Sequence, residues 1–275
     1  MKKLCIDLSA MNPLYKGGVN TYIYGILSGF KKIKSNKYLF NIVCTQENYN
    51  SLKVYKTENL KIIKVKSPNK IYSYFLKLTV LLNLNFFYII FNNLKWKKIT
   101  ECCDNNGDCV YVPTTILNGF NGKKPRILSI HDIQHKHYPE NFRYFELKSR
   151  KFAYDLSVKY SHSIQASSQF IKKDIIKHYN FFNKKRIQVI KEGIDLNKFK
   201  IKKNFKSKIR LSKKYLFYPA QMWPHKDHIT VLKAFNKLNK NYNFHLVLTG
   251  AKLSAYGQIL KFITSNNLKN RVHIL

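Results

Sequence analysis

The segment Tyr215 to His228, YLFYPAQMWPHKDH, has the residue types and spacing of an anion-binding site. Its pattern predicts a buried strand over 215–219, a short turn, and a helix that begins near Lys226. The first turn of a helix presents backbone N–H groups and the positive end of the helix dipole, so it attracts anions. A lysine in that first turn is electrostatically unfavourable unless an anion binds beside it. The segment therefore predicts a phosphate-type site at Lys226.

A second candidate site is His131-Asp132, which ends the predicted strand RILSIH. Open α/β sheets bind ligands outside the carboxyl ends of their strands, which favours a histidine that contacts substrate. A metal site of His131, His135 and His137 is an alternative, but it lacks a helical frame and a fixed carboxylate ligand. A hydrolase site built on the His-Asp pair would need a helical bundle. A structural role for His131 also stays open.

A third candidate is Gly17-Gly18, which follows the first predicted strand and precedes a helix. Paired glycines let the backbone approach a phosphate or a sugar closely. The pattern is not GxGxxG, so the dinucleotide fingerprint is absent, and an ordinary turn remains an alternative.

Strand-like and helix-like runs alternate along the chain, and this alternation must position the three candidates. It predicts an α/β fold with parallel sheets covered on both faces. We expect one Rossmann-like domain over 1–192, a linker over 193–213, and a partial, incomplete domain over 214–275. The predicted strands of the first domain cover 2–9, 38–45, 60–65, 108–113, 126–131, 161–167 and 186–191, with helices over 19–32, 70–98, 141–159 and 168–179. The second domain has predicted strands over 214–219, 243–249 and 271–275, with helices over 226–239 and 254–266.

The charge of the chain is unusual, with 50 Lys and Arg against 14 Asp and Glu, a net charge of +36. Such a charge favours anionic partners: phosphorylated substrates, anionic membranes or nucleic acid. The lysines are scattered and accompany abundant Asn, Ile, Phe and Tyr, which is typical of an AT-rich gene, so we expect no nucleic-acid partner. Five cysteines without a CxxC pair predict neither disulfides nor a zinc site and favour a reducing cytoplasm. The N-terminus leads directly into a strand, which predicts no signal peptide.

One apolar segment, residues 71–91, reaches the ~20 residues that a membrane-spanning helix requires. Lys77, Asn83 and Asn85 interrupt it, and a lysine near the centre of a span is costly. A core or interfacial helix is therefore favoured over a span. The lysines over 95–98, with Trp96 among them, would suit a helix that rests on an anionic bilayer.

Taken together, the motifs resemble those of family 4 of the retaining glycosyltransferases, which have the GT-B architecture of two doubly wound Rossmann-type domains. The matching segments span nearly the whole chain in the order of the family. They are KGGVNTYIYGIL (16–27), ILSIHDIQHKHYPENF (127–142), SIQASSQFIKKDI (163–175), VIKEGIDLNKF (189–199), YLFYPAQMWPHKDHITVLKAF (215–235) and FHLVLTGA (244–251). The sequences of these segments are most similar to those of members that build bacterial surface polysaccharides such as lipopolysaccharide, often mannosyl or rhamnosyl transferases.

The resemblance implies a role for each candidate residue. Gly17 and Gly18 would line the donor diphosphate, and His131 would contact the transferred sugar. Lys226 would bind the diphosphate of the leaving nucleotide, and Gly250 would lie in the nucleotide pocket. The donor would be a nucleotide-diphosphate sugar and the acceptor a glycan or a lipid-linked glycan, with no metal or other cofactor. The resemblance also implies a cytoplasmic enzyme in peripheral contact with the inner face of an anionic membrane.

Two departures from the family pattern bear on activity. The family commonly has Arg at the position of Gln221, which can donate hydrogen bonds to the substrate but carries no charge. The Glu-x7-Glu motif of the family would lie beyond residues 270–275, so we expect a C-terminally truncated donor domain and little or no transfer by this chain. The alternative is a non-catalytic N-terminal domain that binds a membrane glycolipid or a partner subunit.

Overall fold

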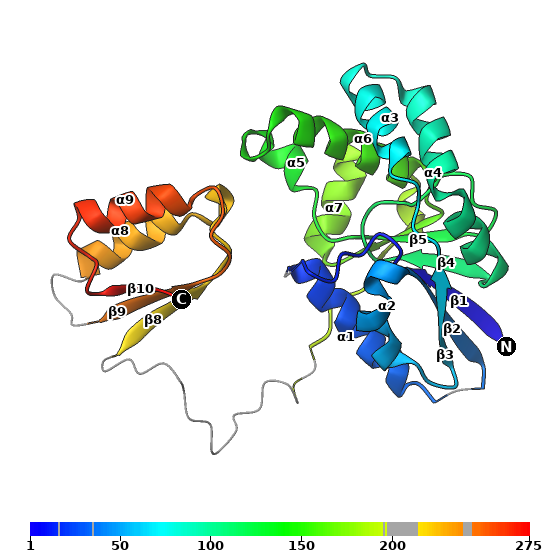
Figure 1. Ribbon diagram of the computed structural model, residues 1–275, viewed down its shortest axis with the longest axis horizontal. Helices are drawn as coiled ribbons and strands as arrows, with labels where there is room; N and C mark the ends of the chain where they lie inside the picture. The colour runs from blue at the N-terminus through cyan, green and yellow to red at the C-terminus, as the bar shows by residue number, and fades with distance from the viewer. Residues whose placement is uncertain (16, 35, 195, 197–213, 239–243) are drawn as a thin grey trace. The chain divides into compact units, whose positions relative to one another are not determined.

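The computed structural model describes the chain except residues 16, 35, 195, 197–213 and 239–243. It divides into two compact units, Met1–Phe199 and Lys200–Leu275, which are treated separately below (Figure 1). Most of the predicted linker over 193–213 lies outside the described residues.

Unit 1 contains a seven-stranded parallel sheet in the order β3-β2-β1-β4-β5-β6-β7. Its strands are β1 (Lys2–Asp7), β2 (Tyr38–Thr45), β3 (Leu60–Val65), β4 (Cys109–Val112), β5 (Arg126–Ile130), β6 (Ser163–Ala166) and β7 (Ile187–Val189). The chain builds outward from β1 to β3 and then returns to build from β4 to β7. The strand order therefore reverses between β1 and β4, and ligands of doubly wound sheets bind at this reversal.

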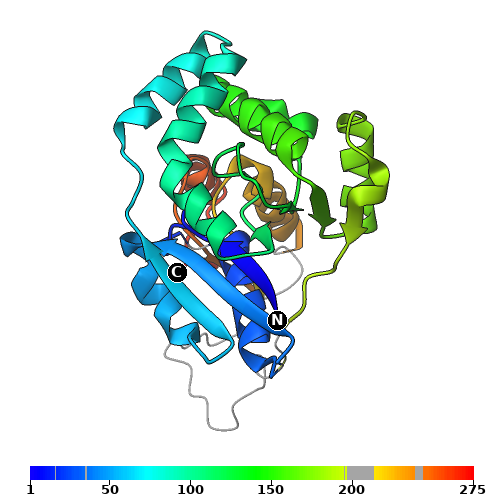
Figure 2. The ribbon, with the colours of Figure 1, turned by 90° about the vertical axis from the view of Figure 1, so that its right-hand side faces the viewer.

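Helices cover both faces of this sheet (Figures 1 and 2). One apolar core joins the sheet to α1 and α2, and a second joins it to α4, α6 and α7. Two buried faces explain why a strand such as β2 is apolar along almost its whole length. The helices are α1 (Gly18–Lys32), α2 (Gln46–Leu52), α3 (Ile71–Leu81), α4 (Asn85–Asn105), α5 (Gln134–His137), α6 (Tyr144–Tyr160) and α7 (Gln169–His178), with 3₁₀ turns η1 (Lys53–Tyr55), η2 (Pro139–Asn141) and η3 (Lys184–Arg186).

Unit 2 contains a three-stranded parallel sheet in the order β10-β9-β8 with its own apolar core. Its elements are β8 (Tyr215–Pro219), η5 (Pro224–Lys226), α8 (His228–Leu238), β9 (His245–Thr249), α9 (Tyr256–Ser265) and β10 (Val272–Ile274). The prediction that strand 215–219 is buried was wrong, because Tyr215, Leu216 and Phe217 are 52%, 42% and 56% exposed. Within the described chain β8 pairs with β9 alone, so one edge of the strand is uncovered.

Two predicted helices also differ from the structure. The single helix over 70–98 is two helices, α3 and α4, separated at Leu82–Leu84, where Asn83 takes a left-handed φ of 58°. Among the described helices, none is long and apolar enough to cross a bilayer. The helix over 226–239 begins later, at His228. The predicted alternation of strands and helices, and with it the α/β class, is confirmed.

Candidate functional site

His131 lies directly after β5 and makes two hydrogen bonds. Its Nδ1 is 2.9 Å from a carboxylate oxygen of Glu192, and its Nε2 is 3.0 Å from the carbonyl oxygen of Pro113. The two contacts hold the imidazole ring from opposite sides. The structure thus holds His131 in a fixed orientation at the carboxyl edge of the sheet.

The ring of Tyr22, on α1, packs against His131 edge to face, with 4.8 Å between ring centroids. The hydroxyl of Tyr22 belongs to a buried network with Tyr111, Ser129 and Gln165, which come from α1, β4, β5 and β6. Burial raises the pKa of the Tyr111 phenol well above its usual range, so the hydroxyl stays neutral. This network joins three strands to α1 and fixes the ring on which His131 rests.

Gly17 and Gly18 form the start of α1. Gly17 is the N-cap, with extended backbone and no side-chain cap, and the first turn has no acidic residue. A Cβ on Gly18 would meet open space, so its backbone is accessible to a ligand. Tyr22 follows Gly18 by one helical turn and contacts His131. The predicted residues Gly17, Gly18 and His131 therefore lie at the same edge of unit 1.

A cleft of about 650 Å³ lies at the carboxyl ends of β1, β2 and β3. The loop between β1 and α1 forms one wall, and the Nδ2 of Asn20 holds that loop to the helix through the carbonyls of Asn12 and Tyr15. Lys70 and Lys95 bring positive charge to the lining and Glu47 a carboxylate. The lining residues are Ser9, Ala10, Met11, Asn12, Pro13, Leu14, Thr45, Glu47, Ser67, Pro68, Lys70, Ser73, Lys95 and Trp96.

Asp7 ends β1 beneath this cleft and is buried. Its carboxylate accepts hydrogen bonds from the backbone and hydroxyl of Ser9, at 3.0 and 2.6 Å, and from the amide of Asn118 at 3.1 Å. Burial raises the pKa of Asp7, and these hydrogen bonds oppose the rise. Asp7 therefore acts within unit 1 as an anchor for the loop that leads to Gly17.

In unit 2, two loops meet at the carboxyl ends of β8 and β9. The backbone N–H of Met222 donates to the carbonyl of Ala251 at 3.0 Å. Gly250 has a φ of +142°, and a Cβ there would lie 2.3 Å from the carbonyl oxygen of Ala220. Only glycine permits this approach, which brings Gly250 beside Gln221.

The placement of Lys226 in the first turn of a helix was wrong. Lys226 ends the 3₁₀ turn η5, and Asp227, with a left-handed φ of 47°, separates it from α8. The carboxylate of Asp227 accepts from the N–H of Thr230 at 3.2 Å, so an acidic side chain caps this helix. Lys226 therefore lies outside the first turn of α8, where Asp227 already places a negative charge. The argument that Lys226 needs a bound anion to offset the helix dipole no longer holds. Lys226 remains exposed on the loop that also carries Gln221.

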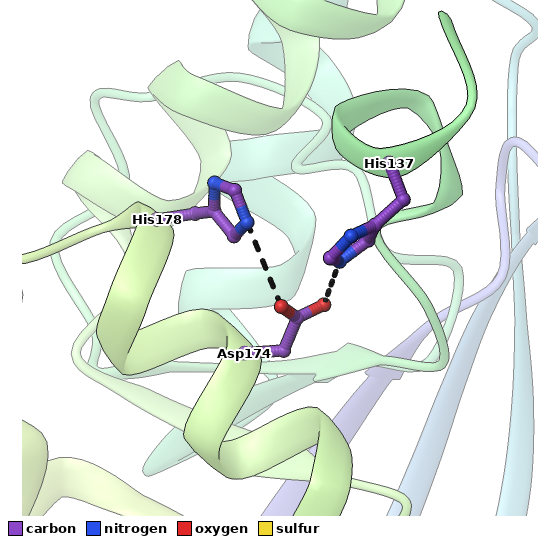
Figure 3. A group of neighbouring side chains, drawn as sticks. All are labelled: His137, Asp174 and His178. Carbon is purple, nitrogen blue, oxygen red and sulfur yellow. Dashed lines mark hydrogen bonds and ion pairs between the residues drawn. The ribbon is translucent and has the colours of Figure 1, made fainter.

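The structure does not group His131, His135 and His137 as metal ligands; among the described residues only His137, Asp174 and His178 come together (Figure 3). Their ligand atoms lie within 4.8 Å of one another. The Nε2 of His137 is 2.6 Å from one carboxylate oxygen of Asp174, and that of His178 is 3.6 Å from the other. The short hydrogen bond ties α5 to α7, which gives His137 and Asp174 a structural role.

Sequence reasoning missed several residues of the site. Tyr22, Glu192 and Asp227 each contact or position a predicted residue, but single tyrosines and carboxylates in polar segments carry no pattern that marks them. The structure unites His131 with Gly17-Gly18 in unit 1 and Gln221 with Gly250 in unit 2.

The chain resembles solved glycosyltransferase structures in its fold. The crystal structure of TarM shares 13% identity over 100% of this chain and 76% of its own, with a TM-score of 0.61. An alpha-glucosyltransferase in complex with UDP-glucose and DNA shares 13% identity over 97% of this chain and 60% of its own, with a TM-score of 0.53. OtsA shares 10% identity over 100% of this chain and 73% of its own, with a TM-score of 0.53. No protein-family model matches the chain, and no curated protein matches its sequence. The fold is GT-B-like.

Proposed function

We propose that this protein transfers a hexose from a nucleotide-diphosphate sugar to a glycan or lipid-linked acceptor, with retention of configuration. The observation that carries the proposal is His131, which Glu192 and Pro113 hold at the carboxyl end of β5 in a GT-B-like fold, with its ring against Tyr22 of α1. TarM and the alpha-glucosyltransferase support it through structures that contain UDP or UDP-glucose. Gly17-Gly18 and Lys226 supply groups that can bind a diphosphate.

The chemistry of the proposed reaction suits these residues. Departure of a nucleoside diphosphate builds negative charge on the leaving oxygen, and preorganised donors stabilise that charge. Lys226 and the backbone N–H groups at Gly17-Gly18 are donors of this kind, so the proposal needs no metal. His131 would hydrogen-bond the transferred sugar, with Glu192 holding its orientation.

The acceptor is proposed to bind in the cleft between the β1–α1 loop and Lys95. Its volume of about 650 Å³ lies in the range of small-molecule sites and suits one or two sugar rings. Lys70 and Lys95 could pair with the phosphate of a lipid-linked acceptor, while Glu47 could accept from sugar hydroxyls.

The test measures binding of radiolabelled UDP- and GDP-sugars to the purified chain. Where transfer to a lipid-linked acceptor is detected, NMR of the product reads its anomeric configuration. We expect one donor to bind the parent chain and to bind Lys226→Ala at least tenfold more weakly, because a hydrogen bond to a charged group contributes about 1.5–3 kcal/mol. Lys237→Ala, which changes an exposed lysine in the last turn of α8, is the matched control and should leave binding unchanged. Binding of no donor, equal loss in both variants, or a product of inverted configuration would contradict the proposal.

A further inference from the structure

The outward faces of α3 and α4 carry an unusual density of apolar side chains. On α3 they recur at Ile71, Tyr74, Phe75 and Leu78, which is the i, i+3, i+4, i+7 spacing of one helical face. A surface helix normally turns polar residues outward and keeps this spacing for the core. The exposed apolar residues, termed here the hairpin face, are Ile71, Tyr74, Phe75, Leu78, Leu81, Leu82, Leu84, Phe86, Phe87, Ile90 and Leu94, each between 36% and 72% exposed.

The hairpin face is one surface, because α3 and α4 are consecutive and packed together, as both ribbon views show (Figures 1 and 2). Phe75 and Phe91 stack between them with 4.9 Å between ring centroids. With roughly 200 Å² for a fully exposed large side chain, the exposed fractions amount to on the order of 1,000 Å². The largest apolar patch on a typical monomer is about 300–600 Å².

The other faces of these helices are already occupied by unit 1. Thr79 and Val80 of α3 are buried, as are Asn92 and Ile99 of α4. Lys148 of α6 donates to the carbonyl of Leu81 at 2.8 Å, which fixes the end of α3 against the body of the unit. The hairpin is therefore anchored from behind, and its apolar face points away from the core that holds it.

The charged residues of the sequence around the hairpin face are all lysines. No acidic residue occurs between Glu58 and Glu101, and eight lysines lie in that stretch. Lys77 is exposed within the face itself, while Lys97 and Lys98 are exposed beyond its end on α4. Exposed apolar side chains that are accompanied by lysines match the acyl chains and anionic headgroups of a bilayer surface. A protein partner would need an acidic rim around an apolar centre.

We propose that the hairpin face is a docking surface for an anionic membrane, on which α3 and α4 lie without crossing it. The inference does not depend on the proposed glycosyl transfer, but it bears on the acceptor. Lys70 and Ser73, at the start of α3, also line the cleft of unit 1. A bilayer on the hairpin face would therefore lie beside the cleft, where a lipid-linked acceptor could enter.

The test is vesicle flotation of the full chain with phosphatidylcholine vesicles and with vesicles that contain phosphatidylglycerol. We expect binding to the anionic vesicles that weakens in high salt. The triple variant Leu78→Gln, Leu82→Gln, Phe86→Gln should bind them at least tenfold more weakly, because the apolar area that enters the bilayer is lost. The matched control is Phe170→Gln with Phe181→Gln, which removes two apolar side chains that are 69% and 59% exposed elsewhere in unit 1.

Circular dichroism must show that both variants keep the parental helix content. The proposal is overturned if the parent does not float with anionic vesicles, or if the control loses as much binding as the triple variant. It is also overturned if the lipid-free chain is a dimer that the triple variant converts to a monomer without a change in vesicle binding, because the occupant would then be a second copy.

Discussion

Replacing Tyr111 by phenylalanine removes one hydroxyl from the centre of the buried network beneath His131. That hydroxyl lies 2.7 Å from the Oε1 of Gln165, 2.6 Å from the hydroxyl of Tyr22 and 2.8 Å from the Oγ of Ser129. Tyr111 donates its single hydroxyl proton to the Oε1 of Gln165, so in the contact between the two phenols Tyr22 must be the donor. The substitution therefore leaves the Tyr22 proton without an acceptor in a buried site.

The magnitude follows from these contacts. Gln165 keeps the hydrogen bond from Ser129 at 3.0 Å, so its oxygen stays satisfied. The variant loses the bond from Tyr22 and the bond to Gln165, each contributing about 0.5–1.5 kcal/mol, and one of the two losses leaves a buried donor unpaired. We expect Tyr111→Phe to lower the free energy of unfolding of unit 1 by about 2–3 kcal/mol.

The assay is urea denaturation followed by tryptophan fluorescence. The chain has two tryptophans, Trp96 in unit 1 and Trp223 in unit 2, so a Trp223→Phe background makes the signal specific to unit 1. Tyr144→Phe, at a ring that is 73% exposed, is the control and should change stability by less than about 0.5 kcal/mol. If Tyr111→Phe matches the control, the hydroxyl network does not hold the site together and the reasoning fails.

Three further substitutions test other parts of the structure. His135 is buried with its pKa lowered to about 4 by burial and by Lys136 and Arg150, so the folded state resists its protonation. The stabilisation that comes from keeping His135 neutral is fully present above pH 6.5 and is lost as the pH falls towards 4. Over this range the parent should lose about 3 kcal/mol of unfolding free energy that His135→Phe retains. Urea denaturation at each pH measures the difference. Gly250→Ala should destabilise unit 2 by about 2–4 kcal/mol, because the new Cβ would lie too close to a backbone carbonyl. Gly257→Ala, whose Cβ meets open space on α9, should be neutral or stabilising. Equal changes in the unfolding free energy, followed by the fluorescence of Trp223, would contradict this. Phe217→Lys should reduce light scattering on concentration, because Phe217 is 56% exposed on the uncovered edge strand β8; unchanged scattering would show that this edge does not drive association.

Much of the fold follows from local pattern. The strand Tyr38–Thr45 was predicted with its observed bounds because six of its eight residues are apolar, and a short, nearly continuous apolar run of this length is typical of a buried strand. The helix Gln46–Leu52 was missed, since its polar sequence QENYNSL lacks an apolar face. It depends on a cap in which Thr45 and Asn48 bond each other, and Asn48 also bonds the loop after β1.

The candidate site was less accessible to sequence reasoning. His131 could be placed at a strand end from sequence, but its partner Glu192 lies 61 residues away and is brought near only by the folded sheet. The sequence pattern predicted a helix that begins near Lys226. The left-handed backbone at Asp227 breaks the helix there, and aspartate is one of the residues that tolerate this conformation without a glycine to signal it.

The central claim is the proposal that this chain binds a nucleotide-diphosphate sugar. Hydrogen–deuterium exchange of the full chain, with and without UDP- and GDP-sugars, tests it most directly. The account predicts that one of these donors slows exchange over 220–226 and 250–253, the segments that carry Gln221, Lys226 and Gly250. Unchanged exchange over these segments with every donor would contradict it.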